Sequence, residues 1–172
     1  MSEQIILVDS DDNNIGSMEK METHRKGLLH RAFSIFIKNS KGEFMLQKRA
    51  DDKYHSGGLW TNTCCGHPRD GEELESAAHR RLAEEMGFDC QFEEIFYFQY
   101  KTGFADGLIE NEIDHIFVGV YDSEPVLNPT EASNFKWMSI EEIKKDVAEN
   151  PDKYTYWFKI ALQKAENMGV EM

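Results

Sequence analysis

The segment from residue 66 to residue 88 constrains the fold more than any other part of the chain. Gly66 and Gly71 mark a loop, and the apolar residues that follow recur at helical spacing: Leu74, Ala77, Ala78, Leu82 and Met86. Gly87 comes directly after the last of them and is placed to end the helix, because glycine readily adopts the left-handed C-cap conformation. A glycine-containing loop followed by one amphipathic helix is therefore predicted.

Charged residues flank the apolar stripe of this helix. Arg80 and Glu84 are four positions apart, as are Arg81 and Glu85, which is the spacing of ion pairs on a solvated helix face. The same carboxylates could instead bind a hard cation that bridges to phosphate oxygens. Glu72 in the preceding loop and the Glu-Glu-x-Gly ending favour the cation site over simple ion pairs.

The spacing of this segment resembles the Nudix box, Gly-x5-Glu-x7-Arg-Glu-apolar-x-Glu-Glu-x-Gly-apolar. The chain matches from Gly66 to Phe88 at every fixed position except one, where Arg81 replaces a glutamate. The resemblance implies a metal-dependent protein that handles a diphosphate. Arg81 argues against hydrolysis of that diphosphate, because it reverses a charge that would help to assemble the metal cluster.

Composition limits the classes of partner. The chain has 172 residues, of which 40% are hydrophobic, so we expect one globular domain spanning residues 1–172. The net charge of −13 argues against a nucleic-acid surface. An anionic ligand would be repelled unless bound metal or clustered Lys and Arg reverse the local field.

The predicted location is the cytoplasm. No apolar run approaches the roughly 18 residues of a membrane-spanning helix, so no membrane partner is expected. The start of the chain lacks the pattern of a secretory signal. Three cysteines, two of them adjacent, make a poor disulfide framework and suggest reduced thiols. The chain is expected to be a monomer or a homodimer.

Strands are expected in the middle of the chain, with helices dispersed among them. Apolar runs predict strands at Gln4–Val8 and at residues 32–37, 44–47, 95–100, 113–121 and 135–138. The runs at 32–37 and 44–47 are expected to form a hairpin through residues 39–42. Ser139 and Glu142 form a capping box that starts a helix. Asn150-Pro151 is expected to end it and open the last helix. This order indicates an α/β sandwich with a mixed sheet.

A second group of candidate ligands is scattered through the sequence: His24, His30, His67, Glu110 and Glu112. Glu110 and Glu112 should project from the same face of a strand, where two close carboxylates need a proton or a metal between them. Three imidazoles and two carboxylates could bind Mn²⁺ or Mg²⁺ in octahedral geometry, or Zn²⁺. Taken singly, each histidine would be an ordinary surface or packed residue, and His55, His79 and His115 are assigned that role; His115 has the opposite strand parity.

Cys65 is the cysteine most suited to chemistry. Its alternative role is that of a small buried apolar residue, which we assign to Cys64 and Cys90. Cys65, however, adjoins Gly66-His67 at the start of the proposed metal-binding loop. A cation there could lower the pKa of its thiol.

These motifs together resemble a specific family, the type 1 isopentenyl-diphosphate isomerases. The resemblance rests on Thr61-Asn-Thr-Cys-Cys-Gly-His-Pro68, on the Arg-Arg form of the Nudix box and on Glu110-Asn-Glu112, and it covers roughly residues 7–157. It implies a Nudix-type α/β/α sandwich with a mixed central sheet. His24 and His30 are one position closer together than the family spacing.

The resemblance also implies a reaction in two proton transfers. Isopentenyl diphosphate would be protonated at its terminal alkene carbon, and loss of a proton from C2 on the opposite face would give dimethylallyl diphosphate. Cys65 and Glu112 would be the acid–base pair, with Tyr100 assisting Glu112. A carbocation-like species needs a pocket without water and with an aromatic face, and Trp157 resembles that aromatic wall.

The metal and diphosphate sites follow from the same resemblance. The first ion would bind His24, His30, His67, Glu110 and Glu112. A second ion, Mg²⁺, would bind Glu85, the carbonyl of Cys65 and the substrate diphosphate. The residues that resemble the diphosphate-binding set are Lys20, Arg49, Lys53 and Arg81.

Two other functions are compatible with parts of the pattern. A Nudix pyrophosphohydrolase acting on a nucleoside or sugar diphosphate would be expected to carry Glu at position 81, where this chain has Arg81. A diphosphate-binding module without catalytic activity would need no acid–base pair, whereas this chain has both Cys65 and Glu112.

Overall fold

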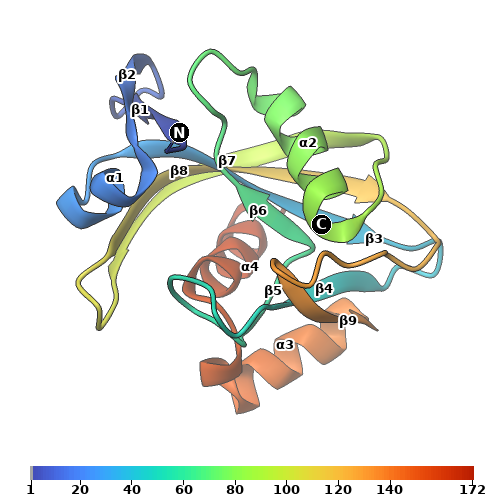
Figure 1. Cartoon of the computed structure of the whole chain (residues 1–172). Helices are drawn as coiled ribbons and strands as arrows, with labels where there is room; N and C mark the ends of the chain where they lie inside the picture. The colour runs from blue at the N-terminus through green and yellow to red at the C-terminus, as the bar shows by residue number, and fades with distance from the viewer. Residues whose placement is uncertain (1) are drawn as a thin grey trace.

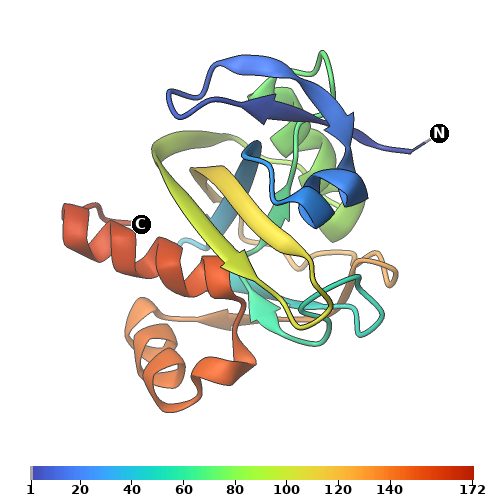
Figure 2. The ribbon, with the colours of Figure 1, turned by 90° about the vertical axis from the view of Figure 1, so that its left-hand side faces the viewer.

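The computed structural model describes residues 2–172, within which nine strands form one mixed sheet. The strands are β1 (Gln4–Val8), β2 (Asn14–Glu19), β3 (His30–Lys38), β4 (Phe44–Arg49), β5 (Trp60–Thr61), β6 (Cys64–Gly66), β7 (Phe92–Gly103), β8 (Ile109–Val120) and β9 (Ala132–Met138). The helices are α1 (Lys20–Lys26), α2 (Leu74–Met86), α3 (Ile140–Glu149) and α4 (Tyr156–Met168), with a 3-10 turn at Pro151–Lys153. Figure 1 and Figure 2 show α2 and α4 on opposite sides of the curved sheet.

The centre of the sheet is the parallel pair β3 and β8, and β8 also pairs antiparallel with β7. Both faces of β3 are buried, as is usual for a strand in a parallel pair. Phe33 and Ile35 pack with Leu82 of α2, whereas Phe36 packs with Phe158 of α4 on the other face. The α/β/α sandwich with a mixed sheet is confirmed.

The expected hairpin between β3 and β4 is correct at its turn and wrong beyond it. The two strands pair only at Lys38 and Phe44. Further along, Thr63 lies between them: its hydroxyl accepts a hydrogen bond from the Ile37 amide (2.9 Å) and donates one to the Met45 carbonyl (2.7 Å). The strands therefore separate, and the gap holds β5, β6 and the motif that contains Cys65.

The helix boundaries are mostly as predicted. Gly87 ends α2 in the left-handed conformation (φ 71°), and a Cβ there would lie 2.3 Å from the Val126 carbonyl oxygen. The Ser139–Glu142 capping box is present at the start of α3. The prediction that Pro151 opens the last helix is wrong, because Pro151 begins the 3-10 turn and the last helix starts only at Tyr156. Within residues 2–172, no helix combines the length and the apolar character needed to span a bilayer.

Candidate active site

The side chains of the candidate catalytic, metal-binding and diphosphate-binding residues lie around one pocket. Every residue predicted for the site either lines this pocket or lies directly beside it. The lining includes Lys20, Arg49, Lys53, Cys65, His67, Arg81, Glu85, Tyr100, Glu110, Glu112 and Trp157. His24 and His30 are fully buried next to it and complete the predicted set.

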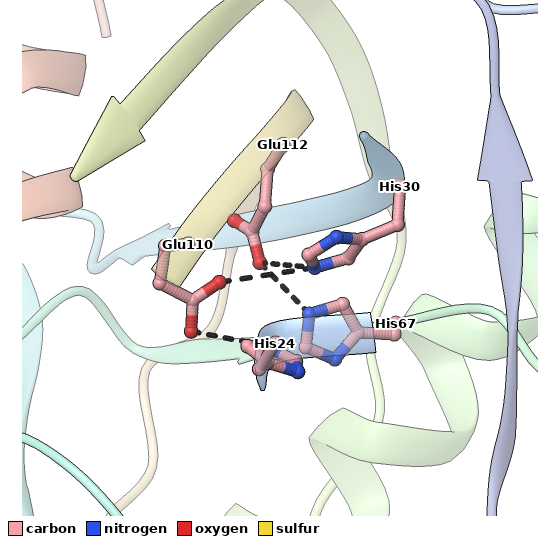
Figure 3. Close-up of side chains that lie close together, drawn as sticks. All are labelled: His24, His30, His67, Glu110 and Glu112. Carbon is pink, nitrogen blue, oxygen red and sulfur yellow. Dashed lines mark hydrogen bonds and ion pairs between the residues drawn. The ribbon is translucent and has the colours of Figure 1, made fainter. Parts of the chain in front are cut away.

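The three histidines and two glutamates form one compact cluster (Figure 3). One ligand atom from each of these five buried residues lies within 4.8 Å of the corresponding atom of every other. Parallel pairing places His30 of β3 opposite Glu112 of β8. Glu110 and Glu112 project to the same side, as predicted, while Asn111 between them donates a hydrogen bond to the Gly27 carbonyl (3.0 Å).

Helix α1 brings His24 into this cluster despite its short separation from His30. The helix ends at Gly27, which adopts the left-handed conformation (φ 62°) and turns the chain into β3. Nε2 of His24 then lies 3.2 Å from Oε1 of Glu110.

The hydrogen bonds of two histidines fit a cation at the centre. Nδ1 of His24 lies 2.6 Å from the Lys20 carbonyl oxygen, and Nδ1 of His30 lies 2.8 Å from that of Leu28. Since a carbonyl only accepts, both Nδ1 atoms carry hydrogen; Nε2 then donates to the carboxylates when the ring is protonated and turns a lone pair toward them when the ring is neutral. Nε2 of His24 and Oε2 of Glu110 are buried without a hydrogen-bond partner. Such a set of lone pairs suits a divalent cation.

The pKa values of the two glutamates are shifted in opposite directions. Burial and the neighbouring charge of Glu112 raise the pKa of Glu110 to about 7. Burial also acts to raise the pKa of Glu112, but hydrogen bonds from His30 and His67 outweigh it and hold that pKa well below the usual range. Burial lowers the pKa of His67 to about 3. The pKa values of two close carboxylates move apart in this way when one carboxylate receives most of the hydrogen-bond donors.

Cys65 lies on the other side of the pocket. Its sulfur accepts a hydrogen bond from Nε1 of Trp157 (3.2 Å) and its thiol donates one to Oδ1 of Asn62 (3.3 Å). Burial and the Glu85 carboxylate raise the pKa of the Cys65 thiol to about 12. The lowering of that pKa by a bound cation stays a prediction. The thiol in this structure therefore retains its proton. Cys64 is fully buried in the core, as predicted.

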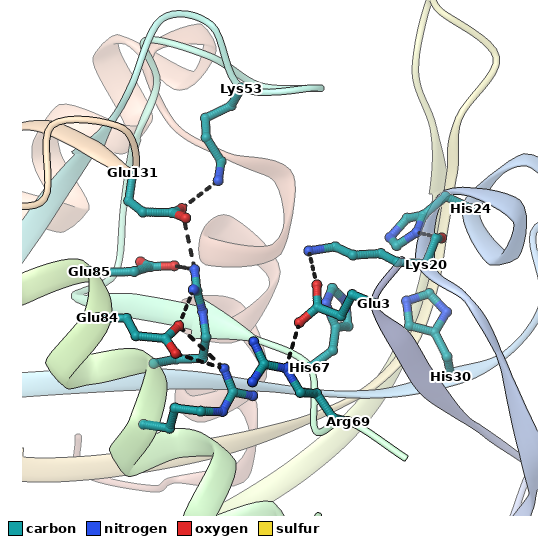
Figure 4. A network of polar contacts seen from close by, with 12 residues as sticks. Glu3, Lys20, His24, His30, Lys53, His67, Arg69, Glu84, Glu85 and Glu131 are labelled. Carbon is teal, nitrogen blue, oxygen red and sulfur yellow. Dashed lines mark hydrogen bonds and ion pairs between the residues drawn. The ribbon is translucent and has the colours of Figure 1, made fainter. Parts of the chain in front are cut away.

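Most of the predicted diphosphate-binding cations already have carboxylate partners (Figure 4). Lys20 lies 3.3 Å from Glu3, and Lys53 lies 2.5 Å from Glu131. Arg81 contacts Glu131 at 3.3 Å and is also paired within its own helix. An anionic ligand must therefore compete with these carboxylates for the cations.

Arg49 differs from the other three cations. Its guanidinium lies 5.2 Å from the ring centre of Trp157, and its Nε is buried without a hydrogen-bond partner. Its terminal nitrogen donates to the His55 carbonyl (3.2 Å). A buried, incompletely satisfied guanidinium beside an aromatic ring is a suitable donor to a phosphate oxygen.

Glu85 is buried at the base of the pocket and is already engaged. It accepts a hydrogen bond from Gln47 (2.8 Å) and forms an ion pair with Arg81. The predicted pairs Arg81–Glu85 and Arg80–Glu84 are both present. The ion pairs use the same carboxylates as the proposed cation site, which stays a prediction.

Sequence reasoning missed His55 as a pocket residue. Its ring is buried, and Nε2 lies 2.6 Å from Oε1 of Glu110. Burial, followed by the charge of Arg49, lowers the pKa of His55 to about 3. No periodicity marks His55, which lies in a loop of glycines and aspartates. His79 pairs with Asp89 away from the cluster, in agreement with its assignment.

His115 lies away from the cluster, as its strand parity predicted. Its two ring nitrogens contact Asp12 at 2.9 Å and Glu94 at 2.8 Å. Both partners come from outside the His/Glu cluster.

Known proteins match the chain over most of its length. The model of the NUDIX domain matches residues 28–158. Isopentenyl-diphosphate Delta-isomerase 2 of Photorhabdus laumondii is 54% identical over 92% of this chain and 90% of its own. Isopentenyl-diphosphate Delta-isomerase of Serratia proteamaculans is 52% identical over 92% of this chain and 88% of its own.

A solved structure supports the fold. The DR0079 protein of Deinococcus radiodurans superposes with a TM-score of 0.73 over 86% of this chain and 90% of its own, at 20% sequence identity. At that identity the likeness concerns the fold alone. The relatives at about half identity carry the family assignment, and the chain therefore belongs to the isopentenyl-diphosphate Delta-isomerase family of NUDIX-domain proteins.

Proposed function

We propose that this protein isomerises isopentenyl diphosphate to dimethylallyl diphosphate by protonation and deprotonation within the pocket described above. The observation that carries the proposal is that Cys65 and Glu112 line one pocket although they come from β6 and β8. Strand β3 pairs with both of these strands, so the Cys65 thiol and the Glu112 carboxylate approach the pocket from opposite sides. A proton can then enter at one side of a five-carbon chain and leave at the other.

The two proton transfers balance without an oxidant or a reductant. One member of the pair donates a proton to the terminal alkene carbon, and the π electrons form the new C–H bond. The other member takes a proton from C2, and those electrons form the new double bond. Exchange of protons with solvent between turnovers returns Cys65 and Glu112 to their starting states.

Aromatic side chains protect the cationic stage of this reaction. Trp157 is buried and presents its ring to the pocket beside Cys65. Tyr100 is buried on the side of Glu112. A pocket enclosed by these rings excludes water that would trap a carbocation as an alcohol, and the π face of Trp157 stabilises positive charge.

The His/Glu cluster is proposed to hold Mn²⁺, Mg²⁺ or Zn²⁺ through His24, His30, His67, Glu110 and Glu112. A second ion, Mg²⁺, would bind Glu85 and the Cys65 carbonyl together with the diphosphate. When bound, these cations supply positive charge that offsets the buried carboxylates and attracts the diphosphate. Lys20, Arg49, Lys53 and Arg81 would bind the remaining phosphate oxygens.

The broader setting is part of the same proposal. The substrate is a small anionic molecule in isoprenoid biosynthesis, and residues 1–172 act as a single domain, as a monomer or a homodimer, in the cytoplasm. Arg81 and the acid–base pair favour isomerisation over a pyrophosphohydrolase or a diphosphate-binding module. The strong negative charge of −13 is unfavourable for nucleic-acid binding.

The test is a product analysis of the purified protein. We expect isopentenyl diphosphate with Mg²⁺ and Mn²⁺ to yield dimethylallyl diphosphate and no released phosphate or pyrophosphate. Nucleoside and sugar diphosphates should remain intact under the same conditions. Phosphate release without dimethylallyl diphosphate would replace the isomerase with the hydrolase, and binding without any product would leave only the diphosphate-binding module.

A further inference from the structure

His55 lies in the loop between β4 and β5 but reaches into the interior of the molecule. Its side chain is nearly inaccessible to solvent. It is absent from the five-residue set whose ligand atoms lie within 4.8 Å of one another. His55 is thus placed beside the His/Glu cluster rather than within it.

The hydrogen bonds of His55 define which of its nitrogens carries hydrogen. Nε2 lies 2.6 Å from Oε1 of Glu110, and Nδ1 lies 3.2 Å from the hydroxyl of Ser56. A Glu110 carboxylate that binds a metal ion is ionised and only accepts, so Nε2 of His55 then donates to Glu110 and Nδ1 can accept from Ser56. This short bond aims one oxygen of Glu110 at His55.

Packing fixes the orientation of the His55 ring. Phe104, in the connection between β7 and β8, stacks on it with ring centres 4.5 Å apart and planes 8° apart. The rings of Tyr54 and Trp157 meet it edge-on at 4.4 Å and 5.6 Å. The imidazole cannot turn its donor away from Glu110 without disturbing three aromatic contacts.

The second oxygen of Glu110 is left facing the cluster. Oε2 is buried without a hydrogen-bond partner and lies 3.8 Å from Nε2 of His30 (Figure 3). His55 thus occupies Oε1 and leaves Oε2 available to a cation. Hydrogen-bond donors behind a metal ligand orient that ligand and tune its affinity.

We propose that His55 is a positioning residue that orients Glu110 for metal binding and connects this ligand to the aromatic wall at Trp157. The inference rests on the proposed metal site. His55 contacts Trp157 with its ring, and its carbonyl accepts the hydrogen bond from Arg49. One residue therefore joins the metal ligand, the aromatic wall and a proposed diphosphate donor.

The test compares variants that differ in whether they can donate to Glu110. His55→Gln retains an N–H near the position of Nε2, whereas His55→Phe keeps an aromatic ring and loses the donor. His55→Asn is polar but too short to reach Glu110. His79→Phe is the matched control, because His79 pairs with Asp89 outside the pocket.

The primary measurement is the Kd of Mn²⁺ for each purified variant after removal of metal, by isothermal titration, together with KM and kcat. We expect His55→Phe and His55→Asn to raise the Kd by about 10- to 100-fold, in line with outer-shell substitutions at other metal sites. His55→Gln should recover most of that loss, and His79→Phe should bind as the wild type does. Excess Mn²⁺ should restore kcat in His55→Asn.

Two results would overturn the role of His55. The first is wild-type Mn²⁺ affinity in folded His55→Asn or His55→Phe, and the second is a Kd in His55→Gln as high as in His55→Asn. If one of His55→Asn and His55→Phe does not fold, the Mn²⁺ affinity of the other is sufficient for the test. Failure of the metal site itself is distinguishable, because Glu110→Gln would then bind Mn²⁺ as the wild type does.

Discussion

Tyr100 donates a hydrogen bond of 2.6 Å to Oε2 of Glu112, while Oε1 of the same carboxylate lies 2.8 Å from Nε2 of His67. The antiparallel register of β7 and β8 places Tyr100 directly opposite Glu112. The two oxygens of one glutamate thus serve different neighbours. Oε1 belongs to the His/Glu cluster, and Oε2 is held on the side of the tyrosine.

Tyr100→Phe removes only the hydroxyl that contacts Glu112. A hydrogen bond to a charged group contributes about 1.5–3 kcal/mol, so kcat should fall by roughly 10- to 100-fold. The Kd for Mn²⁺ should change little, because Oε1 keeps its histidine partners. Steady-state kinetics and metal titration check this. Tyr97→Phe is the control, because Tyr97 is 59% exposed. Equal kcat in wild type and Tyr100→Phe would remove Tyr100 from the mechanism.

Cys65→Ala and Cys65→Ser should nearly abolish isomerisation without unfolding the protein. Loss of a proton-transfer group commonly costs roughly 10²- to 10⁴-fold in rate. Cys64→Ala is the matched control, since Cys64 is fully buried in the core and should affect stability more than rate. The assay is kcat below the unfolding temperature, with circular dichroism to check the fold. An active Cys65→Ala beside an inactive Cys64→Ala would reverse the assignment of the two cysteines.

His67→Asn should weaken binding of the first metal ion. The substitution removes one of five clustered ligands and breaks the contact with Glu112. Glu85→Gln should instead weaken Mg²⁺ and diphosphate binding, because Glu85 lies in the pocket but outside that cluster. Metal analysis and titration of both variants separate the two sites. The five-ligand site would be rejected if His67→Asn kept the stoichiometry and affinity of the wild type.

Arg81→Ala should raise KM more than it lowers kcat, without creating hydrolysis. Lys20, Arg49 and Lys53 remain in the pocket, so the loss of substrate binding should be partial. The variant should also unfold more easily, because the buried carboxylate of Glu85 loses its cation partner. Kinetics, thermal unfolding and phosphate release are the measurements. Phosphate release by Arg81→Ala would show that Arg81 is what blocks a latent hydrolase.

Local patterns predicted the elements that depend on local sequence. Helix α2 and its Gly87 cap follow from helical periodicity, and the common face of Glu110 and Glu112 follows from strand alternation. The separation of β3 from β4 could not be predicted in this way. It depends on Thr63, which comes from a later segment and bridges the two strands.

The same limit explains the pocket residues that were missed. His55 contacts Glu110, which lies 55 positions later in the sequence, and no local sequence pattern indicates this contact. The carboxylates that pair with Lys20 and Lys53, Glu3 and Glu131, are likewise brought in by tertiary packing. The resemblance to the family proposed the five-residue His/Glu set, and the fold brings these residues together. The partners of its members became visible only in the folded chain.

The most direct test of the central claim is isomerisation in D₂O, followed at early times by NMR and mass spectrometry. Protonation by an exchangeable group predicts dimethylallyl diphosphate with one deuterium in the methyl group formed from the terminal alkene carbon. The diphosphate should remain intact, and Cys65→Ala should form almost no labelled product. Dimethylallyl diphosphate without deuterium, or cleavage of the diphosphate in its place, would contradict the proposed mechanism.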